Sequence, residues 1–184
     1  WGVDYNSDRA MNLRFDQLMK LMNDNREYSL LDYGSGYGAM LAYLMRSGHN
    51  VRYYGYDIVE EMVQQGRAIF QGQPDVVFTS QFEEIPEVDY AVVSGTFNMK
   101  LDARNEDWTA LVIDSIERLH RCSRRGFAFN MLTLYSDPDH MRPDLYYANP
   151  GFFFDYCKRH CSRHVALLHD YGLYDFTILV RKDV

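Results

Sequence analysis

Apolar residues follow two patterns that alternate along most of the chain: short continuous runs, and longer stretches in which they recur every three to four residues. The short runs predict buried strands, and the longer stretches predict amphipathic helices. In this alternating part of the chain, the expected strands cover 29–34, 51–58, 75–80, 88–96 and 126–133. The expected helices cover 37–47, 60–70, 108–122 and 151–160. Strands and helices in alternation are joined by right-handed crossovers, which predicts a parallel sheet.

The two ends of the chain add a helix and a hairpin. Ser7 has the side chain of a helix N-cap, and the apolar spacing after it predicts a helix up to about residue 23. Near the other end, the segments 164–170 and 175–182 are separated by only a short turn. Since a parallel pair needs a crossover of a dozen or more residues, these strands must be antiparallel. The chain is therefore predicted to be α/β, with a doubly wound, mostly parallel seven-stranded sheet and an antiparallel C-terminal strand.

Length and charge narrow the class of protein. With 184 residues, the chain is long enough for one sizeable core and too short for a two-domain dehydrogenase. We therefore expect a single domain over 1–184, with 1–28 as an N-terminal helical cap. Nineteen basic residues against 26 acidic residues give a net charge of −7, which opposes a nucleic acid partner because phosphate neutralisation supplies most of that affinity.

Cysteine usage and hydropathy bear on the compartment. The three cysteines are an odd number without the spacing of a disulfide framework, which favours a reducing environment. The apolar runs fall short of the roughly 18 residues of a membrane helix. We therefore expect a cytoplasmic protein that does not bind membranes, and the oligomeric state stays open. The chain begins with Trp1 rather than Met, which indicates a fragment or a trimmed chain.

A glycine-rich turn follows the first expected strand. Gly34, Gly36 and Gly38 alternate with other residues immediately before a helix. Glycine permits backbone conformations closed to other residues and lets a ligand approach the main chain, and the N-terminus of the helix offers free N–H groups. About 20 residues further on, Asp57 ends the second strand, where a carboxylate can bind ribose hydroxyl groups. These features fit both NAD and S-adenosylmethionine.

Asp32, placed two residues before the glycines, resembles the first position of the D/E-x-G-x-G-x-G motif of the class I S-adenosylmethionine-dependent methyltransferases. Asp57 followed by Ile58, and the segments 81–86 and 89–94, are similar to other parts of that family, so the likeness covers nearly the whole chain. A weaker similarity points to its bacterial small-molecule branch, in sugar or natural-product pathways. The resemblance implies S-adenosylmethionine as the cofactor.

The resemblance also implies a set of cofactor-binding residues, and the leading helix could bring Arg14 to the methionyl carboxylate. The set comprises Arg14, Asp32, Tyr33, Gly34, Ser35, Gly36, Gly38, Asp57, Ile58, Met62, Gln81, Phe82, Ser94, Gly95 and Thr96. Gln81 departs from the family, which usually has an acid there to bind the adenine amino group, although an amide can accept the same bond. Arg14 is also compatible with an ordinary surface role, Met62 with a core role, and Phe82 with packing alone.

The end of the fourth strand is the expected position of the reacting methyl group. Open parallel sheets bind ligands beyond the carboxyl ends of their strands, where the strand order reverses, and residues 94–98 follow such a strand. This segment is not the N/D-P-P-Y/F motif that family members acting on nucleobases typically carry, which again argues against DNA or RNA. Asn98 could orient a substrate or serve as a turn residue.

The long polar and aromatic connection over 135–150 is the expected substrate lid, with a solvated loop as the alternative. His169, at the carboxyl end of the sixth strand, is the candidate base because histidine takes up protons near neutral pH. His140 and Tyr135 in the lid are its rivals. The alternative role for His169 is a structural one, in which it caps the hairpin.

No metal is expected. Cys157, His160, Cys161 and His164 carry ligand atoms, but they form a single stripe on one helix, whereas a closed zinc site draws its ligands from more than one element. The sequence therefore predicts a methyltransferase that moves the methyl of S-adenosylmethionine to an oxygen or nitrogen of a small polar, sugar-like or natural-product substrate. An NAD-dependent oxidoreductase and a non-catalytic cofactor-binding domain are the alternatives.

Overall fold

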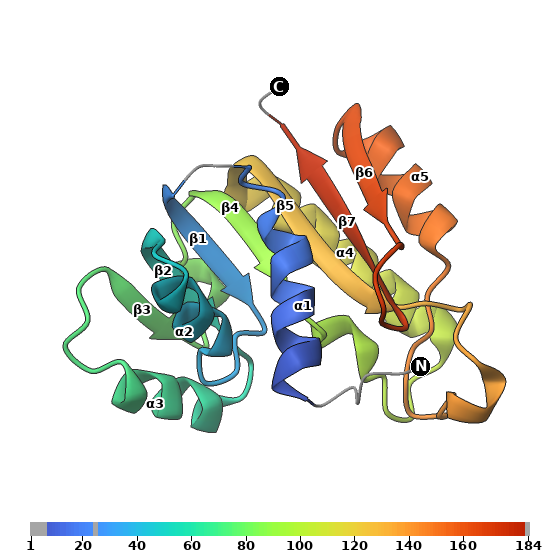
Figure 1. Cartoon of the computed structure of the whole chain (residues 1–184), viewed down its shortest axis with the longest axis horizontal. Helices are drawn as coiled ribbons and strands as arrows, with labels where there is room; N and C mark the ends of the chain where they lie inside the picture. Colours follow the sequence, from blue (N-terminus) through green and yellow to red (C-terminus); the bar gives the residue numbers. More distant parts are fainter. Residues whose placement is uncertain (1–6, 24–25, 183–184) are drawn as a thin grey trace.

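Over residues 7–23 and 26–182, which the computed structural model describes, the chain forms a seven-stranded sheet covered by helices on both faces (Figure 1). The strands are β1 (Glu27–Tyr33), β2 (Asn50–Tyr56), β3 (Val76–Thr79), β4 (Val88–Val93), β5 (Ser123–Leu132), β6 (His164–Leu168) and β7 (Asp175–Arg181). Their order is β3-β2-β1-β4-β5-β7-β6. β1 to β5 are parallel, and β7 is antiparallel to both β5 and β6. The predicted doubly wound sheet with an antiparallel C-terminal strand is confirmed.

Two layers of helices enclose the sheet. They are α1 (Asp8–Met19), α2 (Ala39–Arg46), α3 (Glu60–Ile69), α4 (Asn105–Cys122) and α5 (Pro150–His160). In Figure 1, α1 and α2 lie in front of the sheet, and α4 and α5 lie behind it. Adjacent strand residues face opposite layers: Leu30 shares a core cluster with Leu18 of α1, and Leu31 shares one with Ile116 of α4. Within the described ranges, none of the helices is long and apolar enough to cross a membrane.

Several element boundaries differ from the sequence-based prediction. Helix α4 begins at Asn105 rather than residue 108, β5 begins at Ser123 rather than residue 126, and α5 ends at His160, so that His164 lies in β6 and not on the expected helical stripe. The first helix begins as expected, since Ser7 Oγ accepts a hydrogen bond from Ala10 N at 3.2 Å, but it ends at Met19 rather than near residue 23. The fourth strand ends at Val93, because Gly95 has a φ of +73° and the chain turns into a short 3₁₀ helix, Thr96–Asn98. The expected strand tip over 94–96 is therefore a tight turn.

The expected N-terminal cap, 1–28, is only partly described, since residues 1–6 and 24–25 lie outside the described ranges. Its helix, α1, packs against β5, β7 and α2. One edge of the sheet collects the carboxyl ends of β1, β4, β5 and β6 together with the amino end of β7. The strand order reverses at β1 and β4, which is where an open parallel sheet binds ligands.

Candidate functional site

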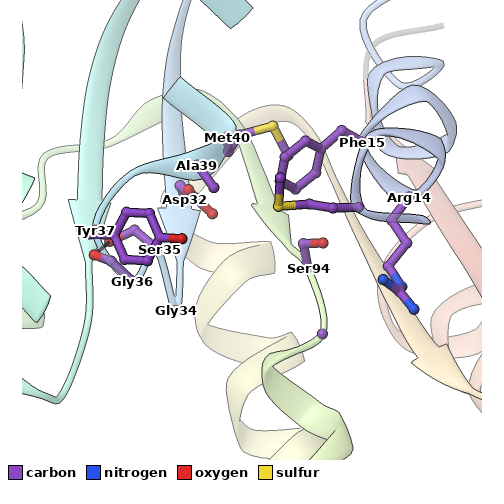
Figure 2. Close-up of a pocket in the computed structure, with 12 residues that line it drawn as sticks. Arg14, Phe15, Asp32, Gly34, Ser35, Gly36, Tyr37, Ala39, Met40 and Ser94 are labelled. Carbon is purple, nitrogen blue, oxygen red and sulfur yellow. Dashed lines mark hydrogen bonds between the residues drawn. The ribbon is translucent and has the colours of Figure 1, made fainter. Parts of the chain in front are cut away.

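A cavity of about 350 Å³ lies between the glycine turn after β1 and the helix α1 (Figure 2). Its wall comprises Met11, Arg14, Phe15, Asp32, Gly34, Ser35, Gly36, Tyr37, Ala39, Met40, Ser94 and Gly95. The volume falls within the range of small-molecule sites, and the mixture of apolar walls with a few polar groups is typical of them. Figure 2 shows Asp32 and the turn on one side, with Phe15 and Arg14 on the other.

The three glycines of the turn have different surroundings. Gly34, with a φ of +80°, lies so close to Thr96 that an added Cβ would be 2.0 Å from the Thr96 Oγ1 atom. Gly38, with a φ of +96°, is equally closed, because a Cβ there would meet the ring of Phe70 at 2.6 Å. A Cβ on Gly36, with a φ of +54°, would meet no described atom within 4 Å. Packing therefore explains two of the glycines, and the third leaves the main chain open to a ligand.

Asp57 connects the turn to the end of β2. Its Oδ2 atom accepts a hydrogen bond from Gly36 N at 2.8 Å, and its Oδ1 atom accepts one from Val59 N at 2.9 Å. The Gly34 and Ser35 N–H groups both donate to the carbonyl oxygen of Tyr56, at 2.7 and 2.9 Å. A carboxylate oxygen has more than one acceptor site, so these bonds leave capacity for ribose hydroxyl groups. The ribose contact of Asp57 stays a prediction.

Asp32 is a buried carboxyl in the wall of the cavity, with 3% of its surface exposed. The pKa of Asp32 is raised to about 7, mainly by burial; the charge of Asp57 contributes to this rise, and the hydrogen bond from Tyr53 opposes it. The Tyr53 hydroxyl donates to Asp32 Oδ2 at 2.6 Å. A cation bound beside Asp32 would favour its ionised form. Sequence reasoning missed Tyr53, which is one aromatic residue in an aromatic strand.

Buried amide side chains hold the tip of β4. Asn130, near the carboxyl end of β5, accepts a hydrogen bond from Gly95 N at 2.8 Å and donates to Ser94 Oγ at 3.4 Å. Asn98, proposed above as a substrate or turn residue, is buried and accepts from Leu132 N at 2.9 Å. Asn130 was missed, although an amide inside an otherwise apolar run was a signal that could have found it.

Arg14 reaches the cavity from α1 and forms a buried ion pair. Its Nε atom donates to Oδ2 of Asp175 at 3.1 Å, and 7% and 0% of the two side chains are exposed. Burial raises the pKa of Asp175, while Arg14, Asn98 and His169 lower it. The sequence pattern indicates Asp175 only as the start of the last strand, and Met11, Phe15 and Met40 only as residues of helices.

Several residues expected at the adenine side lie outside the described wall of the cavity. Ile58 is 82% exposed and Met62 is half-buried in α3. The Phe82 ring packs against Tyr33 and Tyr56, with centroids 6.0 and 5.4 Å apart. Gln81 begins the short helix Phe82–Glu84, and its N–H donates to Thr79 Oγ1 at 3.0 Å. Their adenine contacts remain predictions.

Tyr33 and Thr96 also lie beside the cavity rather than in its described wall. The Tyr33 ring packs on the α4 side of the sheet, and its hydroxyl lies 3.4 Å from Ser115 Oγ. Thr96 Oγ1 donates to the carbonyl oxygen of Tyr33 at 3.2 Å. The two residues therefore hold the turns after β1 and β4 together.

The three candidate bases lie beyond β5 and β6 at the same sheet edge, in two ring pairs. The rings of Tyr135 and His169 have centroids 6.0 Å apart, and those of His140 and Tyr174 have centroids 5.9 Å apart. The Tyr174 hydroxyl donates to Asp137, and Tyr135 is 70% exposed. We call Tyr135, His140, His169 and Tyr174 the ring cluster. The described wall of the cavity includes none of its members.

Comparisons with known proteins agree with this geometry. The family described as "Methyltransferase domain" matches residues 31–119. Rv1506c of Mycobacterium tuberculosis, which carries the name of a methyltransferase, is 47% identical over 164 residues, covering 89% of this chain and 99% of that protein.

Two solved structures that contain S-adenosylhomocysteine have the same fold. One is the Burkholderia thailandensis 1,6-didemethyltoxoflavin-N1-methyltransferase, at 19% identity and a TM-score of 0.67, covering 97% of this chain and 80% of that chain. The other is the magnesium protoporphyrin IX methyltransferase of Synechocystis, at 13% identity and a TM-score of 0.66, covering 95% and 83%.

Proposed function

The chain belongs to the class I S-adenosylmethionine-dependent methyltransferases, and on this premise we propose that it methylates an oxygen or nitrogen atom of a small polar molecule, sugar-like or a natural product. One observation carries the proposal. The cavity reaches the tip of β4 at Ser94 and Gly95, and the connection after the neighbouring strand β5 carries the exposed Tyr135. An acceptor bound on that side would lie beside the end of the cofactor cavity.

The side chains around the cavity fit S-adenosylmethionine by charge. Its ammonium group suits the buried Asp32 carboxyl, its carboxylate suits the Arg14 guanidinium, and its ribose hydroxyls suit Asp57. The open space at Gly36 accommodates a ligand against the main chain. When bound, this cofactor supplies a methyl group on a positively charged sulfur, open to displacement by an oxygen or nitrogen lone pair.

The protein's main task in such a reaction is to align the acceptor with the methyl group. Alignment of this kind is worth several kcal/mol of the activation barrier when the supporting groups are held rigidly. Asn130 provides such support, because it bonds both Ser94 and Gly95. A base is needed only if the acceptor is a hydroxyl group of high pKa, and we propose His169, with His140 and Tyr135 as rivals.

Charge supports a small acceptor over a nucleic acid. The chain carries a net charge of −7, and in the lid Asp137 accepts a hydrogen bond from Tyr174 of the ring cluster, while Asp144 is paired with Arg142. Such a surface repels polyanions, whereas exposed aromatic rings and carboxylates can stack on and hydrogen-bond a neutral polar ring. We therefore propose that the physiological acceptor is neither DNA nor RNA.

The test is a methylation assay with S-adenosylmethionine whose methyl group is trideuterated. The purified protein is incubated with panels of glycosides, phenols, N-heterocycles and amines, and products are located by mass spectrometry and NMR. We expect the label on an oxygen or nitrogen of at least one small molecule, and Asp57→Ala should reduce its yield. Label found only on carbon, on protein or on nucleic acid would overturn the proposal, as would no labelled product from a protein that binds S-adenosylhomocysteine.

A further inference from the structure

Arg14 is a charged side chain in a mostly apolar layer. Helix α1 buries Phe15 and Leu18 against the sheet, and Arg14, on the same helix, is 7% exposed at the wall of the cavity. Arginine is almost never this buried without a counter-charge. In Figure 2 its guanidinium lies on the far side of Ser94 from the glycine turn. Its position is therefore fixed by whatever balances its charge.

That partner is Asp175, which contacts β5, Asn98 and Arg14. It begins β7, opposite Leu132 at the end of β5, and is fully buried. A hydrogen bond with Asn98 supports it, and Asn98 in turn accepts from Leu132 N. The carboxylate takes the Nε atom of Arg14 at 3.1 Å. A strand three positions away from β1 in the sheet thus sets where a cavity-lining cation lies.

Stability alone is a weak reason for such a pair. Two charges taken out of water lose hydration that their mutual attraction only roughly repays, and well-packed apolar residues of similar volume often serve as well or better. The alternative explanation for the buried pair is that the Arg14 guanidinium binds a ligand in the cavity. Guanidinium is planar and offers two edges to carboxylates, so a group that binds the Nε edge directs the Nη edge.

We propose that Asp175 is a positioning residue of the cofactor site, which holds the Arg14 guanidinium where it binds the carboxylate of the cofactor's amino-acid portion. This inference rests on the cofactor and not on the identity of the acceptor. Two carboxyl groups of the protein then act on the amino-acid end of the ligand, one directly and one through an arginine. Asp32 faces its ammonium group, and Asp175 acts on its carboxylate through Arg14.

The test compares two ligands that differ only at that end. S-adenosylhomocysteine carries the amino-acid portion, and 5′-methylthioadenosine keeps the nucleoside and the thioether but lacks it. Calorimetry of Asp175→Asn should show an increase in Kd for S-adenosylhomocysteine of tenfold or more and a change of less than threefold for methylthioadenosine. Asp175→Glu should restore part of the loss. Asp170→Asn, which removes an exposed carboxyl five residues away, is the matched control and should leave both affinities unchanged.

A buried arginine without its partner could prevent folding, so a second variant removes both charges. Arg14→Met with Asp175→Leu replaces the pair by apolar side chains of similar size, and thermal unfolding should show that it folds. It should bind methylthioadenosine as the natural protein does and lose the same tenfold or more for S-adenosylhomocysteine. Full affinity for S-adenosylhomocysteine in this variant would overturn the proposal. Equal losses for both ligands would also overturn it, because they would mean that the pair only attaches α1 to the sheet.

Discussion

The sheet edge that carries the site has two regions that are built differently: the cofactor end, at the glycine turn after β1, and the acceptor end, at the ring cluster beyond β5 and β6. At the cofactor end, main-chain atoms do most of the work: Gly34 and Ser35 donate to a strand carbonyl, and the N–H of Gly36 meets the Asp57 carboxylate. At the acceptor end, the candidate groups are side chains on the loops that connect the strands, and one of them, Tyr135, is 70% exposed. A site built from backbone needs particular residue types at fixed spacing, whereas a site built from exposed side chains can change its chemistry without changing the fold.

The largest effect on stability is expected at Gly34, where the turn at the cofactor end leaves no room for a side chain. Gly34→Ala should destabilise the protein by about 3 to 5 kcal/mol, because the added Cβ combines backbone strain with a clash against Thr96. Binding of S-adenosylhomocysteine should be lost with it. Urea denaturation monitored by circular dichroism measures the free energy of unfolding.

Gly72→Ala is the matched control for this prediction. Gly72 has nearly the same φ, +81° against +80°, but a Cβ there would meet no described atom within 4 Å. It should therefore show only the cost of the left-handed backbone, about 1 to 2 kcal/mol. Similar losses for the two variants would mean that the contact between Gly34 and Thr96 does not limit the turn.

The same contrast explains how far the sequence alone could predict the molecule. The apolar periodicity and the short turn before β7 predicted a mostly parallel sheet with an antiparallel last strand, since both are local signals, but they did not predict the order of the strands. Gly34 and Gly36 were predicted because the turn favours glycine at alternate positions, and Asp32 was predicted from the family resemblance.

Long-range partners could not be predicted in this way. Asp175 pairs with Arg14 across 161 positions, and Asn130 bonds Gly95 across 35. No local pattern distinguishes Asp175 from an ordinary polar residue at the start of a strand. Met11 and Phe15 were predicted as part of an apolar helix face, which they are, but periodicity does not reveal that this face ends at a cavity.

A second prediction concerns the protonation of Asp32 at the cofactor end. Because the pKa of Asp32 is about 7 in the folded protein against an ordinary value of 3.8, the folded state holds a proton that the unfolded chain releases between about pH 4 and 7. Stability from this group is therefore present at low pH and is lost as the pH rises toward 7. The free energy of unfolding of Asp32→Asn relative to that of the natural protein should therefore be higher at pH 8 than at pH 4, by up to about 4 kcal/mol.

Denaturation at a series of pH values checks this difference. Asp139→Asn removes an exposed carboxyl of the lid and serves as the control from the acceptor end. If the stability difference between Asp32→Asn and the natural protein does not change with pH, the Asp32 carboxyl is ionised in the folded state and its environment is more polar than its burial indicates.

A third prediction tests the ribose contact. Asp57→Ala should weaken binding of S-adenosylhomocysteine by about 1 to 3 kcal/mol, because the ligand loses a charged acceptor and the Gly36 N–H loses its partner. Asp57→Asn keeps one oxygen acceptor and should lose less. Methylthioadenosine should be weakened to the same extent, since it retains the ribose, which separates this contact from that of Arg14. Unchanged calorimetric affinity would show that Asp57 serves only the turn.

The last prediction concerns the acceptor end, where a residue acts only if the acceptor reaches it. His169→Gln should lower turnover by more than about tenfold with nearly unchanged cofactor affinity, because only the transition state uses its basicity. Three strand spacings separate β6 from β4, about 14 Å, so the acceptor must either be long or bind under a closed lid. Tyr135 follows β5, a single spacing from β4, and its ring lies 6.0 Å from that of His169. Full turnover in His169→Gln with a loss in Tyr135→Phe or His140→Gln would place the base in the lid, and full turnover in all three would indicate an amine acceptor that is already nucleophilic.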